Sequence, residues 1–117
     1  MDEYRKAYFA GFFDGEGCIS LVRGGPTIAV AVVQVDRAPL DLLSSTYGGK
    51  VNLHGKPAKE SHQQAYRWQV YGSRARVFLE DVRPYLIVKA EKTDEALAMR
   101  DPRPYTTRQM RSYYGLV

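Results

Sequence analysis

Two acidic residues, Asp14 and Glu16, stand two positions apart within the stretch FAGFFDGEG, residues 9–17. Either one can be an ordinary solvated carboxylate near a turn. If two copies of this segment met, however, the paired carboxylates would converge, and like charges at close range are tolerable only with a cation between them. A hard divalent cation with oxygen ligands, Mg²⁺ above all, fits that chemistry. The two acids are therefore candidates for a metal-dependent site.

Three small residues, Ala7, Gly11 and Gly15, recur at a spacing of four in the predicted helix that leads to the acids. This spacing places them in a stripe along one helix face. A glycine inside a soluble helix costs about 1 kcal/mol relative to alanine, so Gly11 requires a packing reason. Either two such helices approach closely, backbone to backbone, or the helix crosses its own sheet closely.

The length of the chain, 117 residues, suits one domain with a core of its own. We expect that core over about 4–100, followed by a tail at 101–117. The single cysteine, Cys18, cannot form an intrachain disulfide, and no leader-like segment opens the chain, so we expect an intracellular protein of the cytoplasm, nucleoid or an organelle matrix. No apolar run approaches the ~20 residues of a membrane span.

Positive charge is concentrated in the middle of the chain, whose formal net charge is +4. Between Leu42 and Leu79 only one acid, Glu60, stands against two histidines and six basic residues: Lys50, Lys56, Lys59, Arg67, Arg74 and Arg76. A one-sided segment of this kind indicates a face that meets a polyanion, because neutralising phosphates releases counterions. An ordinary solvated surface is the alternative.

Apolar periodicity and turn residues divide the chain into alternating helices and strands. Helices are predicted over 2–13, 36–47, 73–83 and 90–100, with a last short one from 106 or 107 to 115. Strands are predicted over 18–23, 27–35, 50–54 and 66–71. Asp36 and Ser73 are the expected N-caps of the second and third helices. This order favours an α+β fold with a four-stranded antiparallel sheet and helices on one face.

The other face of this sheet is the expected nucleic-acid surface. Side chains alternate between the two faces along the third and fourth strands, with apolar residues on one face and a basic, amide-rich set on the other. The basic, amide-rich set comprises Lys50, Asn52, His54, Arg67, Gln69 and Tyr71. Arginine pairs with guanine, and asparagine or glutamine with adenine, at base edges in the major groove. Lys56 and Lys59, in the intervening loop, are placed to touch phosphates. A plain solvent face is the alternative.

The first hairpin is harder to orient. Cys18, Ser20 and Val22 are expected to face the nucleic acid and Ile19 and Leu21 the core, whereas 27–33 is too uniformly apolar to assign. Arg23, near the turn, can touch a phosphate. The tail carries three arginines among three tyrosines and either covers the core or grips the backbone: Arg103, Arg108 and Arg111, with Tyr105, Tyr113 and Tyr114.

The stretch at 9–17 resembles the signature of the LAGLIDADG homing endonucleases. It matches that signature by type throughout and by identity at Ala10, Gly11, Asp14 and Gly17. The chain has Glu in place of the second Asp and Gly in place of the second Ala, which are substitutions that the family commonly shows. The resemblance extends over about 4–99. It includes the segment QVDR at 34–37 and the segment PYLIVK at 84–89, and the order αββαββα matches the saddle-shaped family fold.

The resemblance implies a homodimeric, site-specific DNA endonuclease of the kind found in introns or inteins. Such an enzyme makes a staggered double-strand break in a pseudo-palindromic target by metal-dependent hydrolysis of phosphodiesters. The implied dimer interface comprises Ala7, Gly11, Asp14 and Gly15. Asp14 would be mainly structural, while Tyr8, Phe9, Phe12 and Phe13 would pack the core beside that interface.

The resemblance also implies the roles of the site residues. Glu16 would bind Mg²⁺ together with the backbone carbonyl of Gly15. Gln34 would help order water at the scissile phosphate, and Lys89 would support charge in the transition state. Taken singly, Gln34 and Lys89 can equally be ordinary surface residues.

Two other classes of function share parts of this pattern. One is a catalytically inactive DNA-binding regulator or an RNA-splicing maturase on the same fold. The other is an interaction module whose basic sheet binds RNA or an acidic protein. Glu16, with Gln34 and Lys89 in register, favours the nuclease.

Overall fold

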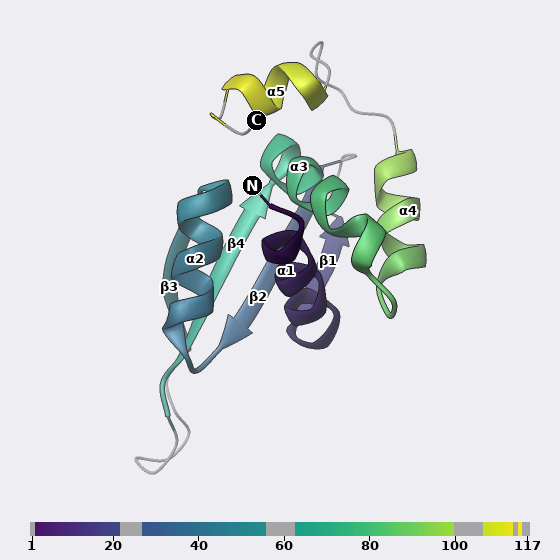
Figure 1. Cartoon of the computed structure of the whole chain (residues 1–117). Helices are drawn as coiled ribbons and strands as arrows, with labels where there is room; N and C mark the ends of the chain where they lie inside the picture. The colour runs from purple at the N-terminus through teal and green to yellow at the C-terminus, as the bar shows by residue number, and fades with distance from the viewer. Residues whose placement is uncertain (1, 22–26, 56–62, 100–106, 114, 116–117) are drawn as a thin grey trace.

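A four-stranded antiparallel sheet carries helices α1, α2 and α3 across one of its faces (Figure 1). This computed structural model describes residues 2–21, 27–55, 63–99, 107–113 and 115. The strands are β1 (Gly17–Leu21), β2 (Ile28–Gln34), β3 (Lys50–His54) and β4 (Ala65–Tyr71), in the order β1-β2-β4-β3. The helices are α1 (Glu3–Glu16), α2 (Arg37–Tyr47), α3 (Gly72–Val82), the 3-10 turn η1 (Arg83–Tyr85), α4 (Ala90–Ala98) and α5 (Thr107–Tyr113). The predicted α+β fold is confirmed.

Local side-chain caps explain where the first two helices begin. Asp2 accepts a hydrogen bond from the backbone N–H of Arg5 at 2.8 Å, and Asp36 accepts one from Ala38 at 3.1 Å, as predicted for Asp36. The predicted cap at Ser73 is wrong. Helix α3 begins at Gly72, whose φ of 56° turns the chain directly from β4 into the helix. Within the described residues, no helix has the length and apolar character needed to cross a membrane.

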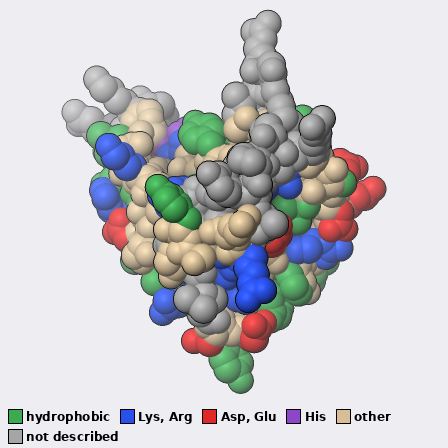
Figure 2. All heavy atoms as spheres, turned by 90° about the horizontal axis from the view of Figure 1, so that it is seen from above, with side chains coloured by type: hydrophobic (Ala, Val, Ile, Leu, Met, Phe, Trp, Pro, Cys, Tyr) green, Lys and Arg blue, Asp and Glu red, His purple; other side chains and the backbone are tan. Residues whose placement is uncertain are grey.

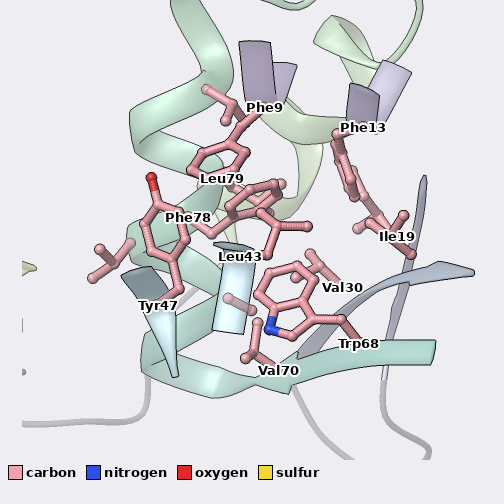
Figure 3. Packing of buried hydrophobic residues seen from close by; sticks show 14 of the residues in the cluster. Phe9, Phe13, Ile19, Val30, Leu43, Tyr47, Trp68, Val70, Phe78 and Leu79 are labelled. Atoms are coloured by element: carbon pink, nitrogen blue, oxygen red, sulfur yellow. The ribbon is translucent and has the colours of Figure 1, made fainter. Parts of the chain in front are cut away.

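Aromatic side chains form the centre of the core (Figure 3). The ring of Phe78 is packed edge-on by Phe13, Tyr47 and Trp68, with centroids 5.0, 5.1 and 5.3 Å away. Such tilted pairs add to the stabilisation that burial itself provides. Phe9 and Phe13 are fully buried, as predicted, but Tyr8 is 51% exposed. The expected place of Tyr8 in the core is therefore wrong.

The reason for the exposure of Tyr8 lies in the rotation of α1. Successive residues of a helix are turned by about 100° around its axis. Phe9, Ala10 and Phe13 are the buried residues of α1, so they occupy the side turned toward the sheet. Tyr8 is rotated away from that side, and its ring stacks on the half-buried Phe12 instead.

The register of the sheet decides which side chains share a face. Cys18 pairs with Ala31, Ala31 with Gln69, and Gln69 with Lys50, so these four lie in one row. Ile19, Val30 and Val70 form the adjacent row and are buried against the helices. We call the face without helices the outer face. In the described strands it carries Cys18, Ser20, Ala29, Ala31, Val33, Lys50, Asn52, His54, Ala65, Arg67, Gln69 and Tyr71.

The structure thus orients the first hairpin. Cys18 and Ser20 lie on the outer face and Ile19 in the core, as expected, while Val22 lies outside the described residues. Leu21, expected in the core, is 58% exposed. It ends the edge strand β1, where no further strand shields it.

Candidate functional site

The carboxyl end of α1 presents a series of backbone carbonyls that the helix itself leaves without partners. The Phe13 carbonyl accepts a hydrogen bond from the N–H of Gly17. The Asp14 carbonyl accepts one from the Lys89 ammonium, Nζ to O, at 2.6 Å. The negative end of a helix dipole attracts cations to this position. The end of α1 therefore favours cationic groups, such as the Lys89 ammonium.

The Asp14 carboxylate anchors the segment that follows η1. Its Oδ2 accepts a hydrogen bond from the backbone N–H of Ile87 at 2.7 Å, and its Oδ1 accepts one from that of Lys89 at 2.9 Å. Burial by itself would raise the pKa of this carboxyl. The backbone hydrogen bonds from Ile87, Lys89 and Val88, together with the charge of Lys89, outweigh burial and lower the pKa below 3.8. Asp14 therefore remains ionised and holds 87–89 against α1.

Lys89 is held at both its backbone and its side chain. Besides the two bonds to Asp14, its Nζ lies 5.8 Å from the centroid of the Phe13 ring. The side chain is half-buried, so its ammonium is confined near the end of α1. The sequence predicted that Lys89 lies at the periphery of a site at this helix end. The structure places its ammonium against the Asp14 carbonyl at that end.

Glu16, the last residue of α1, is exposed, and within the described part of the chain no hydrogen bond or ion pair engages its carboxylate. Gly15, just before it, is exposed as well. Gly17 is required by packing, because a Cβ there would lie 2.1 Å from the buried Phe13 ring. The helix was predicted to stop near Phe13, but it continues through Gly15 to Glu16, and Gly17 leads directly into β1.

Gln34 lies at the same end of the sheet as the end of α1. Gly17 pairs with Val32, so Gln34 follows two residues beyond that pair. Its Oε1 accepts hydrogen bonds from the backbone N–H groups of Val35 at 2.8 Å and Asp36 at 3.4 Å. The side-chain oxygen is therefore occupied locally, and the amide nitrogen is the group that remains for a ligand.

The residues at this end fit a hard divalent cation only in part. Glu16 supplies a carboxylate, and the Gly15 carbonyl is one of the four that end the helix, which are the oxygen ligands that Mg²⁺ uses. Among the residues that the structure describes, no group of three or more His, Cys, Asp or Glu side chains could hold a metal. One chain thus brings two oxygen ligands, and further ligands must come from water, substrate or a second chain.

The small-residue stripe faces away from the rest of the chain. Ala7, Gly11 and Gly15 are all exposed. A Cβ added at Gly11 or Gly15 would meet no atom within 4 Å. The alternative that Gly11 allows α1 to cross its own sheet is therefore wrong. Asp14, expected at the same interface, turns its carboxylate toward Ile87 and Lys89 instead.

The predicted nucleic-acid residues lie on the outer face where the structure describes them. Ser20, Lys50, Asn52 and His54 are exposed, and Arg67 and Gln69 are half-buried, with Arg67 Nε donating to Gln69 Oε1 at 3.3 Å. Arg23, Lys56 and Lys59 lie outside the described residues. The outer face, as described, contains no Asp or Glu.

Acidic side chains gather instead on the side of α4, as Figure 2 shows, where Glu91, Asp94 and Glu95 are exposed.

One buried polar cluster was not predicted from the sequence. Asp81 of α3 is 6% exposed and accepts hydrogen bonds from the hydroxyl of Tyr47 at 2.7 Å and from the guanidinium of Arg111. Burial and the neighbouring Asp81 charge raise the pKa of Tyr47. Arg111 belongs to α5, so this part of the tail covers the core. Arg108 is exposed, and Arg103, Tyr105 and Tyr114 lie outside the described residues.

Comparison with known proteins bears on the fold. No protein-family model matches the sequence, and no curated protein matches it. Among solved structures, the homing endonuclease I-CvuI bound to the I-CreI target in 2 mM Mg, with the DNA not cleaved, aligns with a TM-score of 0.58 and 18% identity, over 98% of this chain and 97% of that one. The same enzyme with its own target in 2 mM Ca aligns with a TM-score of 0.56, at the same identity and coverage. The chain has the LAGLIDADG homing-endonuclease fold.

A third structure supports this assignment. The archaeal intron-encoded homing endonuclease I-Vdi141I, in complex with DNA, aligns over the same shares of both chains with a TM-score of 0.52 and 15% identity. In this homing-endonuclease fold, the signature-like stretch at 9–17 forms the last two turns of α1 and the first residue of β1. Glu16 ends this helix, Lys89 is bonded to Asp14 in its last turn, and Gln34 lies at the same end of the sheet.

Proposed function

We propose that this protein is a metal-dependent, site-specific DNA endonuclease that acts as a homodimer. The observation that carries the proposal is the exposed Glu16 carboxylate at the end of α1, directly beyond an exposed stripe of small residues. A structural carboxylate would be engaged by the chain, as Asp14 is. Glu16 is held out where a cation, a substrate or a second chain can reach it.

The proposed dimer joins two copies of α1 along Ala7, Gly11 and Gly15. Open space beside Gly11 lets a second helix approach closely. Two large apolar side chains next to this helix end, Ile87 at 85% and Val88 at 76% exposure, extend the surface available for burial. A two-fold axis through this contact would bring the two Glu16 residues near each other. The target would then have approximate two-fold symmetry.

The proposed reaction is hydrolysis of one phosphodiester per chain, which yields a staggered double-strand break. Glu16 and the Gly15 carbonyl would hold Mg²⁺. When bound, this ion supplies a lower pKa for water and Lewis acidity toward the phosphate. Lys89 places its ammonium where it stabilises negative charge that develops on the phosphate. Gln34 directs its amide nitrogen toward a water molecule, and Asp14 positions Lys89 rather than contacting the substrate.

The outer face of the sheet is the proposed DNA-binding surface. Ser20, Lys50, Asn52, His54, Arg67 and Gln69 would contact base edges in the major groove, and Arg23, Lys56 and Lys59 would contact phosphates. Its cationic and amide side chains, without a described carboxylate, complement the phosphate backbone.

The test compares wild type with Glu16→Gln on supercoiled plasmid libraries in Mg²⁺, and measures binding separately in Ca²⁺. We expect wild type to linearise plasmids at specific sites, and Glu16→Gln to bind those sites without cutting. Glu95→Gln, on the exposed side of α4, is the matched control and should cut like wild type. Specific binding without cleavage by wild type would reject the nuclease in favour of a DNA-binding regulator.

A further inference from the structure

Arg67 and Gln69 form a connected pair on the outer face. They stand two residues apart on β4, so both side chains leave the same side of the sheet. The Nε of Arg67 donates to the Oε1 of Gln69 at 3.3 Å, and both side chains are half-buried. The pair is thus oriented before any ligand arrives.

This hydrogen bond changes what the pair offers to a base. A free glutamine amide presents one acceptor and two donor hydrogens, the combination that matches adenine. In this pair the amide oxygen is turned to Arg67, so the Nε2 donors of Gln69 are directed away from it. Arg67 retains the four N–H groups of its two terminal nitrogens. The pair therefore directs donors outward, while its one acceptor atom, the Gln69 oxygen, is turned toward Arg67.

The neighbours in the sheet reinforce this pattern. The register places Lys50, another pure donor, opposite Gln69 on the β3 side. On the β2 side, Ala31 stands opposite Gln69 and Val33 opposite Arg67, and neither side chain carries a polar atom. Asn52, opposite Arg67, supplies the one amide oxygen among these four cross-strand neighbours.

We propose that Arg67 and Gln69 act together as a reader of keto bases within each half of the DNA target. Guanine presents two acceptors, N7 and O6, and thymine presents O4, in the major groove. Arg67 then selects guanine, and Gln69 selects guanine or thymine. Adenine and cytosine are disfavoured opposite Gln69, because their amino groups would meet donors. This specificity rests on the proposed DNA-binding function.

The spacing sets the distance between the two bases. Two residues along a strand span about 7 Å, or roughly two base steps of 3.4 Å. The hydrogen bond draws the two head groups closer than that. The keto bases therefore lie within two steps of each other on the target.

The experiment is a random-site selection on duplex DNA with the full-length Glu16→Gln protein in Ca²⁺, so that binding is read without cleavage. We expect two keto-selective positions within two steps in each half-site. Adding Gln69→Glu keeps an acceptor for Arg67 but replaces the donor amide by an oxygen. At one of the two positions it should shift the preference toward cytosine or adenine by about tenfold. Gln69→Ala should flatten that position without a new preference.

Three outcomes separate the possibilities. A shift confined to that position, with the exposed control Lys92→Ala on α4 unchanged, supports the proposal. Adenine at that position in the parent selection, or a consensus that Gln69→Glu leaves unaltered, would overturn the proposal while the endonuclease function stands. A selection that yields no consensus from a folded protein overturns both.

Discussion

Lys89 is tied to Asp14 by two hydrogen bonds, one from its Nζ to the Asp14 carbonyl at 2.6 Å and one from its backbone N–H to the carboxylate at 2.9 Å. The lysine is thereby fixed at the end of α1, on the residue two positions before Glu16. Because the backbone bond does not depend on the side chain, the charge of Lys89 can be removed while the segment stays anchored.

Lys89→Met is expected to slow DNA cleavage by about 100-fold, because a preorganised positive donor near the phosphate is lost. DNA affinity in Ca²⁺ should change little, and the protein should remain folded, since the Asp14 carboxylate still accepts the backbone bonds. Single-turnover cleavage is the measurement. Lys92→Met, which removes an exposed lysine of α4, is the control. Equal effects of both variants would show that Lys89 acts only through general charge.

Asp14→Ala is expected to lower the free energy of unfolding by about 2 kcal/mol near pH 7, because two backbone N–H groups lose a charged acceptor. The folded-state pKa of Asp14 is below its unfolded value of 3.8. Its contribution is therefore complete above pH 5 and is lost as the pH falls through the folded-state pKa. Urea titrations of both proteins at several pH values measure the difference. A gap that stays constant down to pH 2 would contradict this account.

Gly11→Ala should have opposite effects on the single chain and on the dimer. In the chain it removes a glycine from a helix interior without a clash, so the free energy of unfolding rises by about 1 kcal/mol. In the proposed dimer the added methyl group separates the two α1 helices and weakens association. Sedimentation equilibrium together with denaturation at low concentration reports both quantities. Ser45→Ala, at an exposed site on α2, should leave association unchanged.

Arg111→Met is expected to destabilise the protein by about 3 kcal/mol, because it leaves the buried Asp81 carboxylate without its cationic partner. The double variant Arg111→Met with Asp81→Asn should recover part of that loss. Chemical denaturation of the two single variants and the double variant tests the coupling between α5 and α3. If the two substitutions changed the free energy of unfolding additively, the Arg111–Asp81 pair would contribute no coupling between the tail and α3.

Much of the fold follows from patterns within a few residues. The cap at Asp36, the strand at 50–54 and the helical motif at 9–17 depend on interactions between close sequence neighbours, so local chemistry determined them. The resemblance of the motif to the LAGLIDADG signature also indicated the end of α1 as the place of the site. Glu16 and the small-residue stripe are exposed, and their roles in catalysis and in the dimer stay predictions.

Other features depend on where distant segments meet. Asp14 lies 73 and 75 residues before its partners Ile87 and Lys89, and Asp81 lies 30 residues before Arg111. No periodicity encodes such pairs, because they form only when separate helices pack together. Likewise the apolar run of β2 has no alternation of its own, and its two faces were decided by pairing with β1 and β4. The sequence by itself determined the local elements and the catalytic candidate, and tertiary packing determined which distant groups join the helix end that carries it.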